Sequence, residues 1–154
     1  MSNIHEHAAE SPARPPITVL QSEAEALGNL ALSPAGKARL GAELLLEELD
    51  RARLAKDGRL PNDVVCMGAH VLFVDEASQT RHSVQLVYPS RADIAQGRIS
   101  VLTLIGAGLI GLRKGQAIDW PDRSGRFRRL RILHVLQVLQ SGTGFRDFGL
   151  RGLP

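Results

Sequence analysis

The chain has 154 residues, of which 44% are hydrophobic, so it is long enough for one domain with terminal extensions. Only 4% are aromatic, and the single cysteine, Cys66, excludes a disulfide framework and a cysteine-based zinc site. The net charge of +3 is divided unevenly: residues 1–63 carry ten acids and seven bases, whereas residues 64–154 carry six acids and twelve bases. No run of about 18 apolar residues and no secretory signal pattern is present, so we expect a cytoplasmic protein without a membrane span.

Residues 1–16 are polar and end in two prolines, which predicts a flexible N-terminal tail. His5 and His7 lie in this tail. A zinc site needs at least a third ligand, and no further ligand is near in the sequence. We therefore predict no metal site there.

Residues 17–59 have the pattern of two helices joined into a short antiparallel hairpin. Ser22, followed three residues later by Glu25, fits a capping box for the first helix. Ser33 before Pro34 predicts the start of the second helix, with serine as the N-cap and proline at the first helical position.

The second helix is predicted to be the longer one. Its end is expected at Gly58, with Pro61 preventing continuation, so it spans about 20 residues and about 30 Å. The acids Glu47 and Glu48, like Glu43 and Asp50, are assigned to its solvated face. The pair of helices either packs on the main domain or projects from it as an arm. Its apolar stripe consists of Leu40, Leu44, Leu45, Leu49 and Ala52.

From Val64 onward the apolar residues alternate with polar ones, which is typical of β-strands. Residues 75–80 and 121–125 supply turns. Because one glycine-rich helical turn separates the third and fourth strands, we expect an α+β domain with a mostly antiparallel sheet over residues 60–139. Residues 140–154 are expected to be a second flexible tail. The five predicted strands are VVCMGAHVLFVD, HSVQLVYP, RISVLTL, QAIDW and FRRLRILHVLQ.

Gly106, Gly108 and Gly111 form the pattern G-x-G-x-x-G, which in a dinucleotide-binding domain opens a long helix after a strand. Here Gly115 and Pro121 leave no room for that helix, and arginines stand where the ribose-binding acid is expected. We therefore predict no cofactor. The glycines are assigned instead to a helical turn that packs closely on the sheet. The core-facing residues of this turn are predicted to be Leu109, Ile110 and Leu112.

The last predicted strand is rich in arginine. Residues 113–131 carry seven bases against two acids. Alternation places Leu130, Ile132 and His134 on the core face of this strand. An outward basic face needs no special function; alternatively it contacts an acidic protein or nucleic acid phosphates. This basic surface consists of Arg126, Arg128, Arg129 and Arg131.

Several blocks of the sequence, in the same order, resemble the C-terminal domain of Gre-type transcription factors. The segments that carry this resemblance are Gly97 to Val101 and Leu109 to Gly115. Two further blocks, Pro61 to Met67 and Leu86 to Pro89, are closer to one branch of that family, the regulators of nucleoside diphosphate kinase. The resemblance covers about residues 20–138.

The resemblance implies a fold and a partner. The fold is a curved antiparallel sheet with one short helix, similar to FK506-binding proteins (FKBP-like). The partner is bacterial RNA polymerase, bound at the rim of its secondary channel through a turn that matches Thr103, Leu104 and Ile105. In Gre factors a long coiled coil then presents acids at its tip, and these help to hold a magnesium ion for cleavage of backtracked RNA.

The chain departs from that pattern at two places. Its expected hairpin tip, at Asn29, Leu30 and Leu32, carries no carboxylate, and the predicted arm is short. The resemblance therefore implies a regulator that binds polymerase without cleaving RNA. Thr103 and Leu104 replace a small residue and a proline of the family, and Leu102 stands where an acid is frequent. These changes either extend the strand or alter the docking surface.

Two other functions are compatible with parts of the sequence. The fold alone suggests a peptidyl-prolyl isomerase, although the sheet region offers only scattered aromatic residues for a proline pocket. The arginine-rich strand alternatively makes the chain a general nucleic-acid binder, whose affinity would fall steeply with salt. No residue pattern indicates a kinase-binding surface or an oligomeric state. The aromatic residues in question are Phe73, Tyr88, Trp120 and Phe127.

Overall fold

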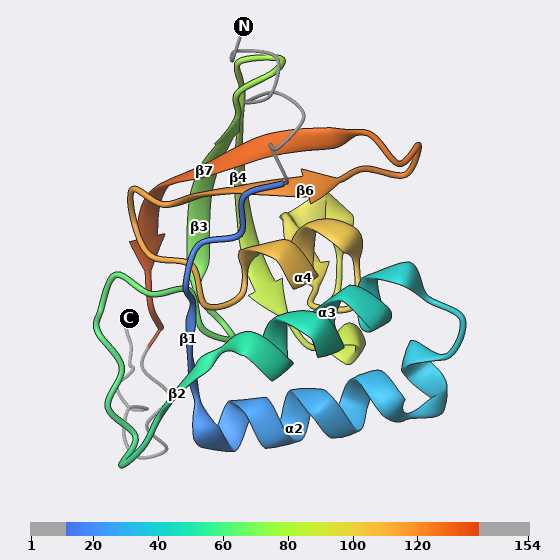
Figure 1. The fold of residues 1–154 in the computed structure, drawn as a ribbon, viewed down its shortest axis with the longest axis vertical. Coiled ribbons are helices and arrows are strands. Elements are labelled where there is room, and N and C mark those ends of the chain that lie inside the picture. The colour runs from blue at the N-terminus through green and yellow to red at the C-terminus, as the bar shows by residue number, and fades with distance from the viewer. Residues whose placement is uncertain (1–11, 139–154) are drawn as a thin grey trace, which may run out of the picture.

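The computed structural model describes residues 12–138, and it places a curled sheet over a layer of helices (Figure 1). The strand order is β5-β4-β3-β7-β6; all neighbouring pairs are antiparallel except β4 with β5, which is parallel. The predicted mixed α+β architecture with a mostly antiparallel sheet is therefore confirmed. The strands are β3 (His70–Asp75), β4 (Thr80–Val87), β5 (Arg98–Ser100), β6 (Ala117–Pro121) and β7 (Phe127–Leu136).

The first part of the chain contributes two helices and a second, small sheet. Strand β1 (Thr18–Leu20) leads into α2 (Gln21–Leu32), and α3 (Leu40–Arg51) returns along α2 before strand β2 (Arg53–Ala55) (Figure 1). Strands β1 and β2 pair in parallel, so the two ends of the helix pair are joined. The short helical segments are η1 (Pro34–Gly36), η2 (Pro89–Arg91), η3 (Ile94–Gln96) and α4 (Leu104–Leu109).

The predicted capping box does not form. Helix α2 begins directly after β1, and its N-cap, Leu20, makes no side-chain capping hydrogen bond. Ser22 lies inside the first turn instead. The reason is tertiary: β1 already fixes the backbone at the helix entrance, because Leu20 pairs with Ala55.

Helix α3 is shorter than its apolar pattern predicts. Ser33 caps only the 3-10 turn η1, accepting a hydrogen bond from the Ala35 N–H at 3.2 Å, and α3 does not begin before Leu40. Its 12 residues span about 18 Å. The helix ends at Arg51 rather than near Gly58, because the next residues pair with β1 and the Arg53 N–H donates to the Ile17 carbonyl.

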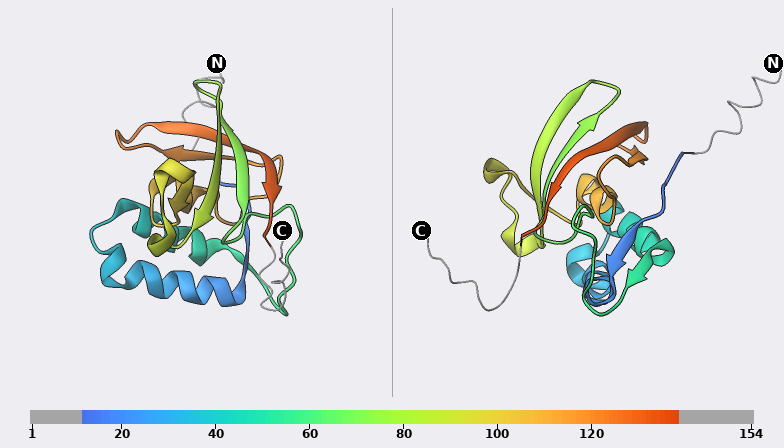
Figure 2. Two further views of the ribbon diagram at one scale, coloured as in Figure 1. Left: turned by 180° about the vertical axis from the view of Figure 1, so that it is seen from behind. Right: turned by 90° about the vertical axis from the view of Figure 1, so that its left-hand side faces the viewer.

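The helix pair packs on the sheet instead of projecting from it. Leu27 of α2 and Leu45 of α3 are fully buried in the same core as Phe73 and Trp120 of the sheet. The α3 backbone also lies close to the turn before α4, since a Cβ atom at Gly41 would meet the Leu102 carbonyl oxygen at 2.1 Å. The two layers are seen edge-on in Figure 2.

The glycines of the G-x-G-x-x-G pattern serve close packing, as predicted. A Cβ atom at Gly106 would lie 2.2 Å from the Ser100 carbonyl oxygen, and one at Gly108 would lie 2.8 Å from the Trp120 indole ring. Gly111 has a φ of +82°, which disfavours residues with a side chain. The core residues of this segment are Leu109, Ile110 and Leu112, all buried.

The predicted orientation of His134 is wrong. Leu130 and Ile132 face the core, but β7 contains a bulge, because Leu72 pairs with His134 while Phe73 pairs with Ile132. Leu133 is therefore an extra residue, and the alternation changes face beyond it. As a result, the His134 side chain is exposed.

Residues 13–16 are not loose, although they fall in the predicted N-terminal tail. The Ala13 N–H donates to the Asp119 carboxylate, and the Asp119 N–H donates to the Ala13 carbonyl at 2.8 Å. The remaining predicted tail segments, residues 1–11 and 140–154, lie outside the described residues.

Candidate functional site

A groove of about 980 Å³ opens between the start of α3 and the inner face of the curled sheet. Its walls come from five places in the chain: the start of α3, the β3–β4 hairpin, the η3–β5 segment, the turn before α4, and the β6–β7 turn. We call this cavity the groove. Residues far apart in the sequence thus meet in one concave surface.

The predicted contact turn lies on the wall of the groove. Thr103, Leu104 and Ile105 all line it, with Thr103 exposed and the other two half-buried. Strand β5 ends at Ser100, so Leu104 begins α4 and does not extend the strand. Of the two readings of the sequence, strand extension is therefore wrong.

Three hydrogen bonds fix the shape of this turn. The Thr103 hydroxyl oxygen accepts from the Gly106 N–H at 3.0 Å and donates to the Ser100 carbonyl at 2.7 Å. The Trp120 indole N–H donates to the Leu104 carbonyl at 2.6 Å. Because α4 is both capped by a side chain and tied to β6, the turn presents a preformed surface.

The acids inside the groove already have hydrogen-bond partners. Asp75 is almost fully buried and accepts a hydrogen bond from the Arg128 guanidinium at 2.6 Å. Asp122 closes the β6–β7 turn by accepting from the N–H and hydroxyl groups of Ser124 at 2.8 and 2.7 Å. These hydrogen bonds, the Ser124 side chain first, lower the pKa of Asp122 below its ordinary value.

The predicted basic surface is divided between two faces and largely paired. Arg128 points into the groove, where it meets Asp75, whereas Arg129 and Arg131 lie on the other face of β7. Arg129 donates to Asp119 at 2.8 Å, and Arg131 to Glu76 at 2.5 Å. The hydrogen bond from Arg129 lowers the pKa of Asp119. Among the four predicted arginines, only the exposed Arg126 has a guanidinium without an ion pair within residues 12–138; its backbone N–H donates to the Asp122 carboxylate at 3.1 Å.

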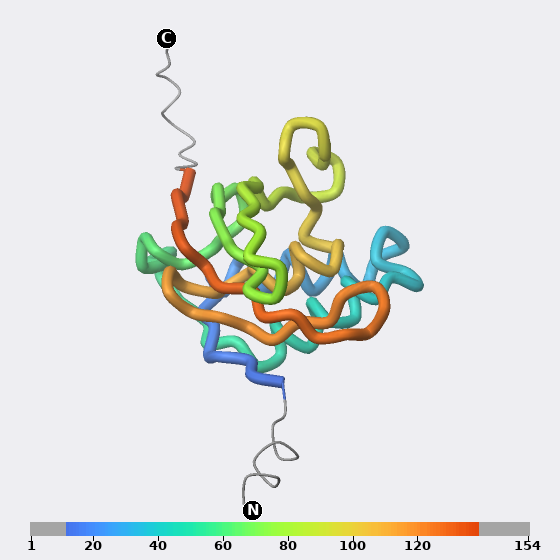
Figure 3. The backbone as a smooth tube through the Cα atoms, turned by 90° about the horizontal axis from the view of Figure 1, so that it is seen from above, coloured from blue at the N-terminus to red at the C-terminus, as the bar shows by residue number. Residues whose placement is uncertain are grey.

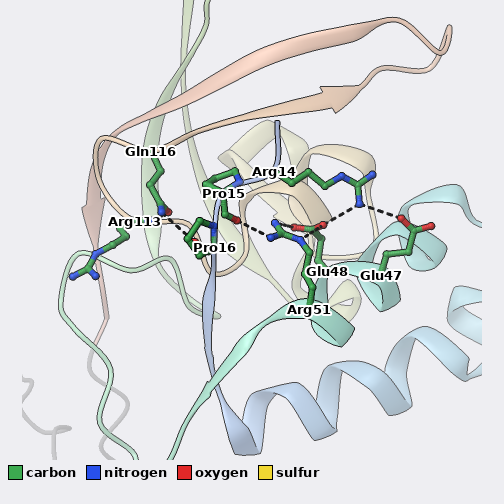
Figure 4. A network of polar contacts seen from close by, with 8 residues as sticks. All are labelled: Arg14, Pro15, Pro16, Glu47, Glu48, Arg51, Arg113 and Gln116. Carbon is green, nitrogen blue, oxygen red and sulfur yellow. Dashed lines mark hydrogen bonds and ion pairs between the residues drawn. The ribbon is translucent and has the colours of Figure 1, made fainter. Parts of the chain in front are cut away.

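A buried carboxylate joins the N-terminal segment to α3 (Figure 4). The Glu48 side chain is 1% exposed and accepts hydrogen bonds from Arg51 at 2.6 and 2.9 Å and from Arg14 at 3.2 Å. Arg51 also donates to the Pro15 carbonyl at 2.7 Å. Arg14 extends over the Trp120 ring, 5.2 Å from its centroid. The network therefore connects residues 14–15, α3 and β6.

The assignment of Glu48 to a solvated face is thus wrong. Glu48 stands three and four residues after Leu45 and Leu44, which places it on the apolar stripe of α3. Two features of the sequence could have predicted that Glu48 is buried: its spacing from Leu44 and Leu45, and Arg51 three residues further on, which can pair with it.

The connection between the helices lies later in the chain than predicted. Asn29 and Leu30 are in the last turns of α2, and Leu32 is its final residue, 74% exposed. The connection itself comprises residues 33–39 and carries Lys37 and Arg39 but no acid. Although the connection lies at residues 33–39, it contains no carboxylate, and its two charged residues are both basic.

A second cluster surrounds the single cysteine. Burial, followed by the nearby Glu23 carboxylate, raises the pKa of the half-buried Cys66 thiol to about 11. Burial also raises the pKa of Glu23, whose carboxylate accepts from the Met67 N–H at 3.3 Å. A thiol with such a pKa is almost entirely protonated at neutral pH and is a poor nucleophile.

Neither a metal cluster nor a membrane span occurs in the described part of the chain. Within residues 12–138, no three histidine, cysteine or acidic side chains gather closely enough to hold a metal ion. None of the helices in this range has the length and apolar character that crossing a bilayer requires. His5 and His7 lie outside it.

The fold and the site define a small α+β protein in which a curled sheet carries a capped helical turn and packs against two short helices. Comparison with known proteins gives the family. Residues 60–137 match the model of "Transcription elongation factor, GreA/GreB, C-term", and the chain belongs to this family.

Relatives with known names support this membership over most of the chain. The "Regulator of nucleoside diphosphate kinase" of Escherichia coli (strain K12) is 33% identical over 122 residues, which are 79% of this chain and 90% of that protein. "Transcription elongation factor GreA" of Azorhizobium caulinodans is 32% identical over 132 residues, covering 79% of this chain and 82% of that protein. The solved structure of a GreA/GreB factor from Nitrosomonas europaea has a TM-score of 0.62 at 33% identity, covering 80% of this chain and 99% of its own.

Proposed function

We propose that this protein is a non-catalytic transcription regulator that binds bacterial RNA polymerase near the secondary channel, in the cytoplasm. Membership of the GreA/GreB family supports transcription as the process. The basic connection between α2 and α3, with Lys37 and Arg39 in place of acids, is the observation that carries the non-catalytic part.

Cleavage of backtracked RNA requires carboxylates that reach a magnesium ion at the active site. Here α3 spans about 18 Å, and the helix pair packs against the sheet. Glu48 is buried with two arginines, and Glu47 pairs with Arg14 at 3.1 Å. Glu47 and Glu48 are thus engaged by arginines. Glu43, in the first turn of α3, is exposed, but a short helix pair that lies against the domain gives it little reach towards a distant metal ion.

The contact with polymerase is assigned to the turn of Thr103, Leu104 and Ile105. The family resemblance implies this turn, and its position on the wall of the groove supports it. A preformed turn beside a concave surface suits docking of a protein segment, because little conformational entropy is lost on binding.

An effect on nucleoside diphosphate kinase is treated as indirect. The name of the Escherichia coli relative describes that protein as a regulator of this kinase. A regulator of transcription alters the amount of a kinase without touching it. We therefore propose polymerase as the direct partner.

The two other candidate functions gain no support. An isomerase needs accessible aromatic side chains around a pocket, but Phe73 and Trp120 are 2% and 1% exposed. Tyr88 and Phe127 are exposed but do not line the groove. A nucleic-acid binder needs unpaired cations along the arginine strand, where Arg128 and Arg131 are paired with acids.

The direct test is co-purification of bacterial core RNA polymerase with the tagged chain. We expect a stable complex that excess GreA displaces, because both proteins would occupy the rim of the secondary channel. Failure to retain polymerase, with a folded chain verified by circular dichroism, would refute the proposed function.

A further inference from the structure

The groove has an apolar floor and an exposed apolar edge. Leu102, Trp120 and Leu130 form buried parts of its lining, at 2%, 1% and 2% exposure. At the edge, Ile94 is 82% exposed and Leu40 is 50% exposed. Large apolar side chains that stand open beside a concave surface indicate a surface that another molecule covers.

The charges of the groove are not balanced. Arg128 is already engaged by Asp75 and Asp122, at 2.6 and 3.9 Å. Arg39, at the start of α3, and Arg123, in the β6–β7 turn, line the same groove and are exposed. Neither makes an ion pair within residues 12–138. The lining therefore contains three arginines and two acids, a net charge of +1, and two of the three guanidinium groups have no ion pair within residues 12–138.

The two arginines come from elements on the same side of the molecule. In Figure 1 and Figure 3, the connection before α3 (cyan) and the β6–β7 turn (orange) lie at the same end of the sheet. A ligand that entered the groove from this end would pass between the two elements.

We propose that the groove receives an acidic protein segment with at least one apolar side chain, whose carboxylates pair with Arg39 and Arg123. The apolar side chain covers the floor near Leu102 and contacts Ile94 at the edge. This inference rests on the proposed function, under which the segment belongs to RNA polymerase. Charge complementarity of this kind adds specificity and association rate to the apolar contact.

A protein segment fits these observations better than a nucleic acid. Single-stranded nucleic acids bind by stacking bases on exposed rings. Trp120, in the groove floor, is 1% exposed, and its indole N–H is already bonded to the Leu104 carbonyl. The exposed His82 ring on the groove wall is stacked on Phe73, with ring centroids 5.1 Å apart. The remaining floor is aliphatic, which suits leucine-like side chains.

The test compares the affinity of purified core RNA polymerase for the full-length parent and for charge-reversed variants. The double variant Arg39→Glu, Arg123→Glu is expected to weaken binding at least tenfold in Kd. Arg59→Glu is the control: Arg59 is exposed, makes no ion pair with residues 12–138 and lies outside the groove, so its Kd should change less than about twofold. Both side chains are exposed, so we expect the reversals to leave the fold intact. At Arg39, the N-cap of α3, an acid is also favourable for the helix.

Two further variants separate charge from apolar contact. Arg39→Lys, Arg123→Lys keeps the positive charge and should retain most of the affinity. Ile94→Asp, at an 82% exposed position, should weaken binding without loss of stability. A single-stranded oligonucleotide is tested in parallel by fluorescence anisotropy.

The possible results are distinct. If the parent binds polymerase but the double reversal binds equally well, the inference about the groove is wrong and the proposed function stands. If reversal abolishes only oligonucleotide binding, the groove takes nucleic acid and the inference is also wrong. If the parent does not bind polymerase at all, the proposed function fails, and the inference fails with it.

Discussion

Gly108 shows how a single residue limits what the fold tolerates. Its Cα lies so close to Trp120 that a methyl group would overlap the indole ring. The ring cannot move away easily, because its N–H is bonded to the Leu104 carbonyl. The dinucleotide-like pattern is therefore explained by packing at each of its glycines.

Gly108→Ala should lower the free energy of unfolding by about 1–3 kcal/mol, the usual cost of overpacking a core. Gly28→Ala is its control, because Gly28 lies inside α2 with no heavy atom within 4 Å of the added Cβ. That variant should gain about 0.5–1 kcal/mol from helix propensity. Urea unfolding followed by circular dichroism measures both. Equal midpoints for Gly108→Ala and the parent would contradict the close contact.

Glu48→Gln should destabilise the chain by about 3 kcal/mol, because Arg14 and Arg51 would keep their charges without a buried partner. We choose the low end of the range for buried pairs, since both arginine side chains are 27% exposed. Glu47→Gln is the control. Its carboxylate is 59% exposed, so the change should cost less than about 1 kcal/mol. Similar losses in the two variants would mean that burial of Glu48 has no energetic weight.

Cys66 should react slowly with maleimide, and its rate should keep rising with pH towards the thiol pKa of about 11. Relative to an ordinary thiol, the thiolate population at pH 8 is lower by about a hundredfold. Glu23→Gln removes a negative charge and should speed the reaction by lowering that pKa. Labelling in urea serves as the unfolded reference. A rate that levels off below pH 9 would contradict this environment.

At the scale of elements, the strands could be predicted from the sequence, because the alternation of apolar and polar residues that marks a strand is a local pattern. The ends of α3 do not, because they depend on the pairing of residues 18–20 with residues 53–55, which are distant in the chain. The orientation of His134 depends on a bulge that no residue pattern marks. The groove was not predicted, since its walls come from five separate segments, of which the sequence identified only the turn before α4 and Arg128.

Leu104→Pro should leave stability unchanged or raise it slightly. Leu104 is the first residue of α4, where the missing N–H of proline costs no intrahelical bond. Thr103 before it has φ −78° and ψ 163°, which is the conformation that a following proline favours. Thermal unfolding tests this expectation. A strong loss of stability would mean that the Leu104 side chain or N–H has a structural role beyond the turn.

For the whole molecule, addition to backtracked elongation complexes with magnesium should release no short 3′ RNA fragments. The physical reason is the lack of carboxylates in residues 33–39, which carry two bases instead. GreA is the positive control in the same assay. Fragment release above the uncatalysed level would contradict the non-catalytic function.

The parallel pairing of β1 with β2 has a consequence for how this architecture can vary. The helix pair leaves and re-enters the domain at one clamped junction, where Thr18 is opposite Arg53 and Leu20 is opposite Ala55. Equal numbers of residues inserted into both helices, on either side of residues 33–39, would lengthen the pair and leave this junction in register. Length of the pair and integrity of the domain are thus separable properties. Variants with a longer α2–α3 pair could therefore be designed without changing the core of the domain.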